Sequence, residues 1–130
     1  MENEKITEDD VIRHGGWNAR FARVRLIVQD NDVAVTIVDG NGDGAEFETE
    51  CWWRGPKGWR NLISSGGIGS GMGSVFDDGA MTSCVGIAEP HAIVTVRFRG
   101  ESYDCEANDL GYWGFVRRTD DVTESPEIVA

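Results

Sequence analysis

Histidine is scarce in this chain, and the short motifs that usually mark a catalytic centre are missing. The sequence contains only His14 and His91, neither lies in an HExxH motif, and no serine lies in a GxSxG motif. We therefore predict that the protein is not an enzyme. A site assembled by folding from His91 with Asp104, Glu106 or Asp109 stays open, because a sequence does not show which side chains are adjacent in space.

The chain also lacks paired cysteines, long apolar runs and a basic N-terminus. Cys51, Cys84 and Cys105 form no CxxC pair, which is typical of reduced thiols rather than of a disulfide framework. No run approaches the ~18 apolar residues that a membrane span needs, and residues 1–10 have neither the positive charge nor the apolar segment of a secretory signal. These absences predict a cytoplasmic protein that does not bind a membrane.

Positive charge is low, with 12 Lys and Arg against 23 Asp and Glu, and the excess of acid lies at the ends. Residues 1–12 carry five acids and one lysine, and residues 120–130 carry four acids and no basic residue. This balance excludes nucleic acid as a ligand, because such binding requires Lys and Arg against phosphates. It allows a basic protein partner or self-association. We expect an acidic N-terminal arm at 1–12, one folded domain at 13–119 and an acidic tail at 120–130.

Apolar and polar residues alternate along much of the chain, as in strands buried on one face. The alternation predicts that Val24, Leu26 and Val28 face one way, and that Val96 and Phe98 point inward on a central strand. Only residues 5–14 have a pattern suited to a short helix. We predict a single-domain, all-β antiparallel β-sandwich of about seven or eight short strands, with a small β-barrel as the alternative. The predicted strands are 24–28, 33–37, 46–53, 58–63, 84–88, 93–99, 102–107 and 112–118.

Residues 64–79 are rich in glycine and interrupt this pattern. Their spacing matches no nucleotide-binding loop, so we expect a long mobile connection between strands that is available to a ligand or partner. In this loop the candidate contact residues are Ile68, Met72, Asp77 and Asp78. Nearby, Trp52 either faces solvent as a further contact or packs beneath the loop, while Trp53, Trp59 and Trp113 fill the core.

Residues 39–50, DGNGDGAEFETE, have the spacing of a calcium loop. Asp39, Asn41 and Asp43 occupy alternate positions, and the Ala45 carbonyl and Glu50 complete an oxygen ligand set suited to Ca²⁺. The segment resembles the EF-hand loop and, because its flanks have strand character, also the loops between strands of FG-GAP propeller blades. The alternative is a plain hairpin turn built on Asn-Gly and Asp-Gly, which would leave Glu46, Glu48 and Glu50 as an exposed stripe.

Two functions from different classes agree with these observations. The first is a non-enzymatic intracellular protein-interaction module, such as an inhibitor, an immunity-type factor or an assembly component, with acidic ends. The second is a calcium-supported β-sandwich module that binds a carbohydrate or peptide through Trp52 and the 64–79 segment.

Overall fold

The computed structural model of the chain describes residues 4–68 and 71–129. Parts of the predicted arm, loop and tail (1–3, 69–70 and 130) lie outside these residues. Within the described part of the chain, one helix, α1 (Glu8–His14), precedes ten strands. The strands are β1 (Arg23–Asp30), β2 (Val33–Asp39), β3 (Phe47–Gly55), β4 (Gly58–Gly66), β5 (Gly71–Phe76), β6 (Gly79–Ile87), β7 (Ile93–Phe98), β8 (Glu101–Glu106), β9 (Tyr112–Thr119) and β10 (Glu127–Val129).

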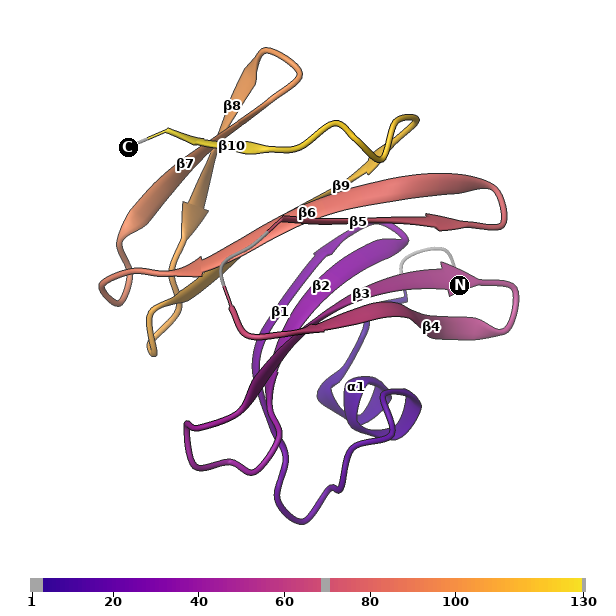
Figure 1. Cartoon of the computed structure of the whole chain (residues 1–130), viewed down its shortest axis with the longest axis vertical. Helices are drawn as coiled ribbons and strands as arrows, with labels where there is room; N and C mark the ends of the chain where they lie inside the picture. The colour runs from indigo at the N-terminus through magenta and orange to yellow at the C-terminus, as the bar shows by residue number, and fades with distance from the viewer. Residues whose placement is uncertain (1–3, 69–70, 130) are drawn as a thin grey trace.

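The strands form three antiparallel sheets rather than the two of a simple sandwich. The first sheet has the order β1-β2-β3-β4, the second β5-β6-β9 and the third β10-β7-β8. Within the described ranges no sheet closes into a barrel, so the predicted all-β sandwich is confirmed and the barrel alternative is wrong. Figure 1 shows four stacked layers, with α1 at the bottom followed by the first, second and third sheets.

Each interface between layers contains its own apolar cluster. Val35 of β2 and Val85 of β6 lie between the first and second sheets, and Val96 of β7 packs with Phe115 of β9 between the second and third. The first sheet packs its other face on α1, through Val38 and Val11. Because both of its faces are covered, β2 is buried along its whole length. Burial on this scale is the main driving force for the stacking.

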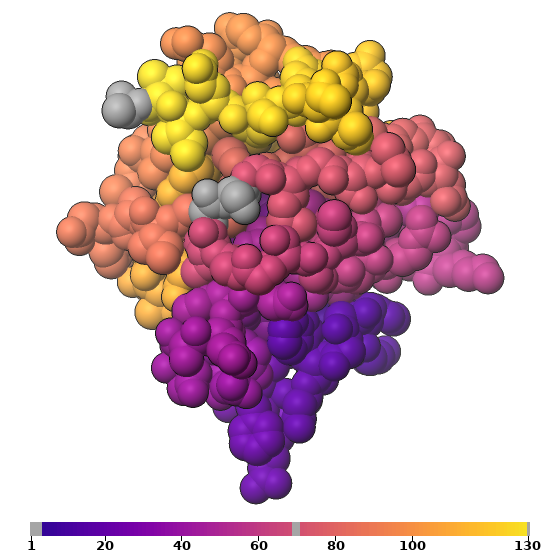
Figure 2. All heavy atoms as spheres, in the orientation of Figure 1, coloured from indigo at the N-terminus to yellow at the C-terminus, as the bar shows by residue number. Residues whose placement is uncertain are grey.

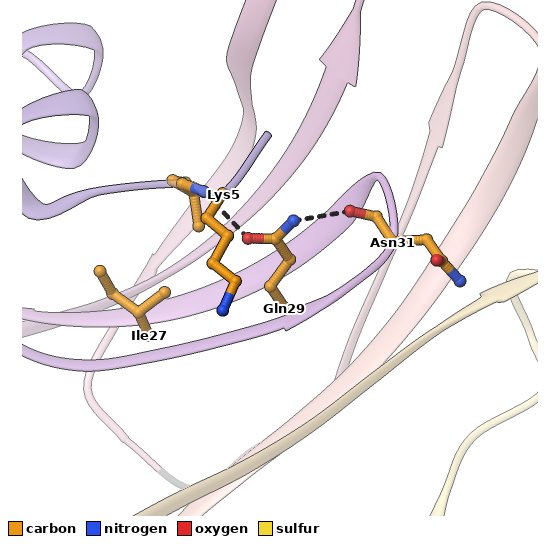
Figure 3. Close-up of a pocket in the computed structure, with 5 residues that line it drawn as sticks. Lys5, Ile27, Gln29 and Asn31 are labelled. Atoms are coloured by element: carbon orange, nitrogen blue, oxygen red, sulfur yellow. Dashed lines mark hydrogen bonds between the residues drawn. The ribbon is translucent and has the colours of Figure 1, made fainter. Parts of the chain in front are cut away.

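The N-terminal segment is docked on the first sheet. Thr7 and Asp10 form a reciprocal capping box at the start of α1, and Ile6 and Val11 are buried. Gln29 of β1 holds this segment, because the Ile6 amide donates to its Oε1 at 2.9 Å and its Nε2 donates to the Glu4 carbonyl at 3.2 Å. Figure 3 shows Gln29 beside Lys5, with the same Nε2 also bonded to the Asn31 carbonyl at 2.7 Å. Ile6 and Val11 belong to the apolar cluster on this face of the first sheet, so buried apolar contacts hold the segment in place.

The C-terminal segment is held by β10, which pairs with β7 through Ile128 opposite Val96. Both charged ends therefore contribute to the fold, and α1 extends across the predicted boundary at residue 12. The predicted positions of Val96 and Phe98 are confirmed, since both are buried on β7, the central strand of the third sheet.

Two strand predictions were wrong. The described part of 64–79 contains the end of β4, the whole of β5 and the start of β6 rather than one long loop. Glycine serves here for close packing, because a Cβ at Gly73 would lie 2.8 Å from the Val122 carbonyl oxygen. In β1 a bulge between Val24 and Leu26 shifts the register, so Val24 packs toward α1 while Leu26 faces the second sheet.

Candidate functional site

The predicted calcium ligand Asp39 lies at the end of β2, and its carboxylate is already fully engaged. It accepts from the Gly42 amide at 3.0 Å, the Gly44 amide at 2.8 Å and the Arg25 guanidinium at 3.1 Å. Burial alone would raise the pKa of Asp39, but Arg25 and the two amides outweigh it and lower that pKa. Asp39 thus fixes the turn after β2.

Glu50, the twelfth residue of the motif, lies in the middle of β3 and is only 2% exposed. Its carboxylate accepts from Trp17 Nε1 at 3.2 Å, Ser64 Oγ at 3.3 Å and Thr36 Oγ1 at 3.4 Å. Burial raises the pKa of Glu50 to about 7, although these donors oppose the shift. The expectation that Glu50 belongs to an exposed stripe is wrong, because Trp17 and α1 cover this face of the first sheet.

The other proposed ligands remain in the turn. Asn41 Nδ2 donates to Glu46 at 3.2 Å, and Asp43 accepts from the Ala45 amide at 3.1 Å. The structure thus separates Glu50 from the rest of the motif, and across residues 4–68 and 71–129 no group of three or more His, Cys, Asp or Glu is placed to hold a metal ion. Calcium binding stays a prediction.

The five predicted contact residues do not share one surface. Trp52 is fully buried on the α1 side of β3 and donates from Nε1 to Thr36 Oγ1 at 2.9 Å. Ile68 and Met72 pack against the cluster between the first and second sheets, on the other side of β3. Asp77 and Asp78 are exposed in the β5–β6 turn, where they pair with Arg60 and Arg118.

An aromatic hollow of about 390 Å³ lies at the β3–β4 hairpin and is lined by Trp53, Trp59, Pro56 and Lys57, among others. Both tryptophan rings are buried, and Trp53 stacks on Phe76 with ring centroids 4.8 Å apart. Trp53 belongs to the cluster between the first and second sheets and Trp59 to the cluster under α1, so both rings lie in the core, as predicted.

A different set of residues gathers at one end of the molecule, where the β6–β7 and β8–β9 connections meet. The Ala88 amide donates to the Gly111 carbonyl at 2.8 Å, and the Ala107 amide donates to the Ala92 carbonyl at 2.9 Å. A Cβ at Gly111 would lie 2.3 Å from the Ala88 carbonyl oxygen, so this approach requires glycine. In Figures 1 and 2 the β6–β7 connection projects at the left of the view.

Asn108 organises the second of these connections. Its Oδ1 accepts from the amides of Leu110 and Tyr112, both at 3.0 Å, and its Nδ2 donates to the Arg25 carbonyl at 2.8 Å. The amide side chain therefore fixes the turn and ties it to β1 of the first sheet.

His91 bridges two carboxylates on this end. Its Nδ1 lies 3.1 Å from Glu106 Oε2 and its Nε2 lies 2.7 Å from Asp109 Oδ1. Glu106 and Asp109 together raise the pKa of His91. Each ring nitrogen thus lies beside a carboxylate, and the imidazole acts as a clamp that joins the β6–β7 connection to Glu106 and Asp109.

Three large aliphatic side chains stand out around this clamp. Ile87 is 64% exposed, Leu110 58% and Ile93 57%. A hollow of about 630 Å³ joins Leu110 to the clamp residues, and Ile93 lies directly opposite Glu106 in the β7–β8 register. We call the following residues the loop-end surface: Ile87, His91, Ile93, Glu106, Asp109 and Leu110.

The sequence left open a cluster of His91 with Asp104, Glu106 or Asp109. The structure brings His91, Glu106 and Asp109 together, whereas Asp104 accepts from Thr95 Oγ1 at 3.2 Å. Sequence reasoning missed Ile87, Ile93 and Leu110. A signal was available, because each is a large aliphatic residue just beyond or at the limit of a strand, next to a polar turn.

No known family, curated protein or solved structure matches this chain. Within residues 4–68 and 71–129, no helix is long and apolar enough to cross a membrane.

Proposed function

We propose that this chain is a non-enzymatic protein-interaction module that docks a basic protein partner on its loop-end surface, as an inhibitor, an immunity-type factor or an assembly component would. The observation that carries the proposal is the exposure of Ile87, Ile93 and Leu110 at one end of the fold, where Leu110 lines a hollow together with His91, Glu106 and Asp109. Exposed aliphatic side chains that gather in this way are typical of surfaces that a partner covers.

The carboxylates on the loop-end surface favour a partner that carries positive charge. Glu106 and Asp109 are exposed on the loop-end surface, and Glu89 adds a further carboxylate in the β6–β7 connection. An apolar centre with an acidic rim favours a partner that presents aliphatic or aromatic side chains among Lys and Arg.

Site-specific photocrosslinking in cells that express the chain tests this proposal. A benzophenone amino acid replaces Leu110 in one variant and Val75 in a matched control, because Val75 is 67% exposed on β5 in the second sheet. We expect a protein adduct from position 110 that is lost when Ile87→Ser is added, and none from position 75. Absence of an adduct at 110, or equal adducts at both positions, would overturn the proposal.

A further inference from the structure

The third sheet has a free edge at β8. In the order β10-β7-β8, β8 pairs with β7 on one side, and among the described residues no strand lies on its other side. Figure 1 shows the β7–β8 hairpin projecting from the top of the stack, away from the first sheet. A strand edge of this kind presents unpaired N–H and C=O groups to any extended chain that approaches it.

The register tells which backbone groups face outward. The Ala107 amide donates to Ala92 across the same ladder, so alternate residues from Ala107 back through Cys105 and Tyr103 bond toward β7. The N–H and C=O groups of the residues between them, Ser102, Asp104 and Glu106, then point to the free edge.

The side chains of β8 sort onto two faces. Ser102, Asp104 and Glu106 are exposed on the outer face, while Tyr103 and Cys105 are half-buried on the face that packs over β9. A strand added beside β8 would therefore meet two carboxylates on its outer side and would extend the apolar cover on its inner side.

We propose that the edge of β8 accepts an extended, basic segment of the partner protein as an added antiparallel strand. This inference rests on the proposed function and gives its binding mode, since Glu106 belongs both to this edge and to the loop-end surface. Backbone hydrogen bonds would supply affinity. Lys or Arg at alternate positions would supply selectivity by pairing with Asp104 and Glu106.

A second copy of the chain is a poor occupant of the same edge. Antiparallel pairing of β8 with itself would bring Asp104 and Glu106 close to the same carboxylates of the other copy. Like charges in directly opposed positions destabilise a strand pair, and acidic edges are a common protection against self-association.

The test uses the synthetic peptide acetyl-Val-Lys-Val-Arg-Val-Lys-Val-amide with a fluorescent label, titrated with the full chain and followed by anisotropy. Its composition control carries the same residues with the basic side chains grouped at one end. We expect saturable binding of the alternating peptide, at least about tenfold tighter than the control, because only alternation places every cation on one face.

Backbone methylation separates strand addition from simple charge attraction. In an antiparallel pair with β8, the amides of the Lys and Arg residues face the edge, and those of the intervening Val residues face away. N-methylation at Lys and Arg should weaken binding at least about tenfold, while N-methylation at the inner Val residues should not. Binding that survives methylation at Lys and Arg would overturn the proposal.

Two variants of the protein test the same backbone hydrogen bonds by changing β8 instead of the peptide. Ser102→Pro removes one outward amide, whereas Ser102→Ala keeps it, so only the first should weaken peptide binding. If Ser102→Pro does not fold, the N-methylated peptides still test whether the peptide binds by strand addition. If the peptides do not bind while position 110 gives its adduct, strand addition is wrong and the proposed function stands; if position 110 gives no adduct, the proposed function itself is wrong.

Discussion

Glu50 places a carboxylate between the first sheet and the N-terminal segment, where almost no water reaches it. Its position could not be predicted from the sequence, because the segment that covers it lies more than thirty residues away at Trp17. Alternation along β3 showed which residues share a face with Glu50, and that part was correct. Which face is solvated depends on the whole fold.

The raised pKa of Glu50 predicts that stability falls as the pH rises. The folded state holds this proton more tightly than the unfolded chain does, so the stabilisation is complete below pH 4.5 and is lost between pH 4.5 and about 7. Glu50→Gln keeps the shape and removes the charge. It should stabilise the protein at pH 8 by on the order of 2 kcal/mol and have little effect at pH 4.5.

Thermal melts of both proteins at these two pH values would measure the difference. Glu101→Gln is the control, since Glu101 is an exposed carboxylate on β8 of the third sheet. An equal effect of Glu50→Gln at both pH values would show that Glu50 is not protonated in the folded protein.

Whether the 39–50 motif binds calcium depends on the side chain of Asp39. Calcium would have to compete with Arg25 and two amides for its carboxylate, and Glu50 would have to leave its own donors. If the motif binds Ca²⁺, titration of chelator-stripped protein should release or absorb heat, and calcium at a hundred times its Kd should stabilise the fold by about 2.7 kcal/mol. Asp43→Ala is the control, because loss of this ligand should abolish any calcium response. A flat calorimetric trace of the parent protein up to millimolar calcium would leave residues 39–44 as a turn.

Among the elements, β7 and β8 were the most predictable because they alternate strictly and are joined by a tight turn at Arg99 and Gly100. β5 was missed because glycine in a sequence normally marks a turn, whereas in this strand it allows the 120–124 segment to pass close by. The sequence alone does not show that the 120–124 segment packs against Gly73.

Phe98 of β7 provides a test at the scale of one element. It is buried and lies edge-on to Phe115 of β9, with ring centroids 5.8 Å apart. Phe98→Ala should destabilise the fold by about 3–5 kcal/mol, which is enough to unfold a domain of ordinary stability. Urea denaturation would measure this loss, and a neighbouring Arg97→Ala variant should change stability by no more than about 0.5 kcal/mol. A Phe98→Ala protein as stable as the parent would contradict the packing of β7 on β9.

At the scale of the whole molecule, the sequence predicted strands, antiparallel pairing and short connections, but not three sheets. Alternation reports one buried face, whereas β2 and the middle of β3 are buried on both. The residues of the loop-end surface carry a signal in the sequence, but their grouping does not, because they come from the ends of β6, β7 and β8 and from two connections that only the folded chain brings together.

Removal of residues 1–10 tests whether the N-terminal segment is part of this stack. The deletion takes away the buried Ile6, the capping box at Thr7 and the partner of Gln29. Burial of one isoleucine contributes about 1.5–3 kcal/mol, so the midpoint of thermal unfolding should fall by several degrees. Lys5→Ala, on an exposed neighbour, should leave it unchanged, and an unaltered midpoint after the deletion would show that the segment is not docked.

The order of the strands along the chain has a consequence for how the protein folds during synthesis. The first sheet is built only from consecutive hairpins within residues 23–66, whereas β6 and β9 of the second sheet pair across the whole β7–β8 hairpin. Local contacts form fast and distant ones slowly, so we expect the first sheet to be complete on the ribosome before β9 has emerged. Until then its face toward β6 has no cover, which makes the half-finished chain, rather than the native protein, the species most exposed to aggregation.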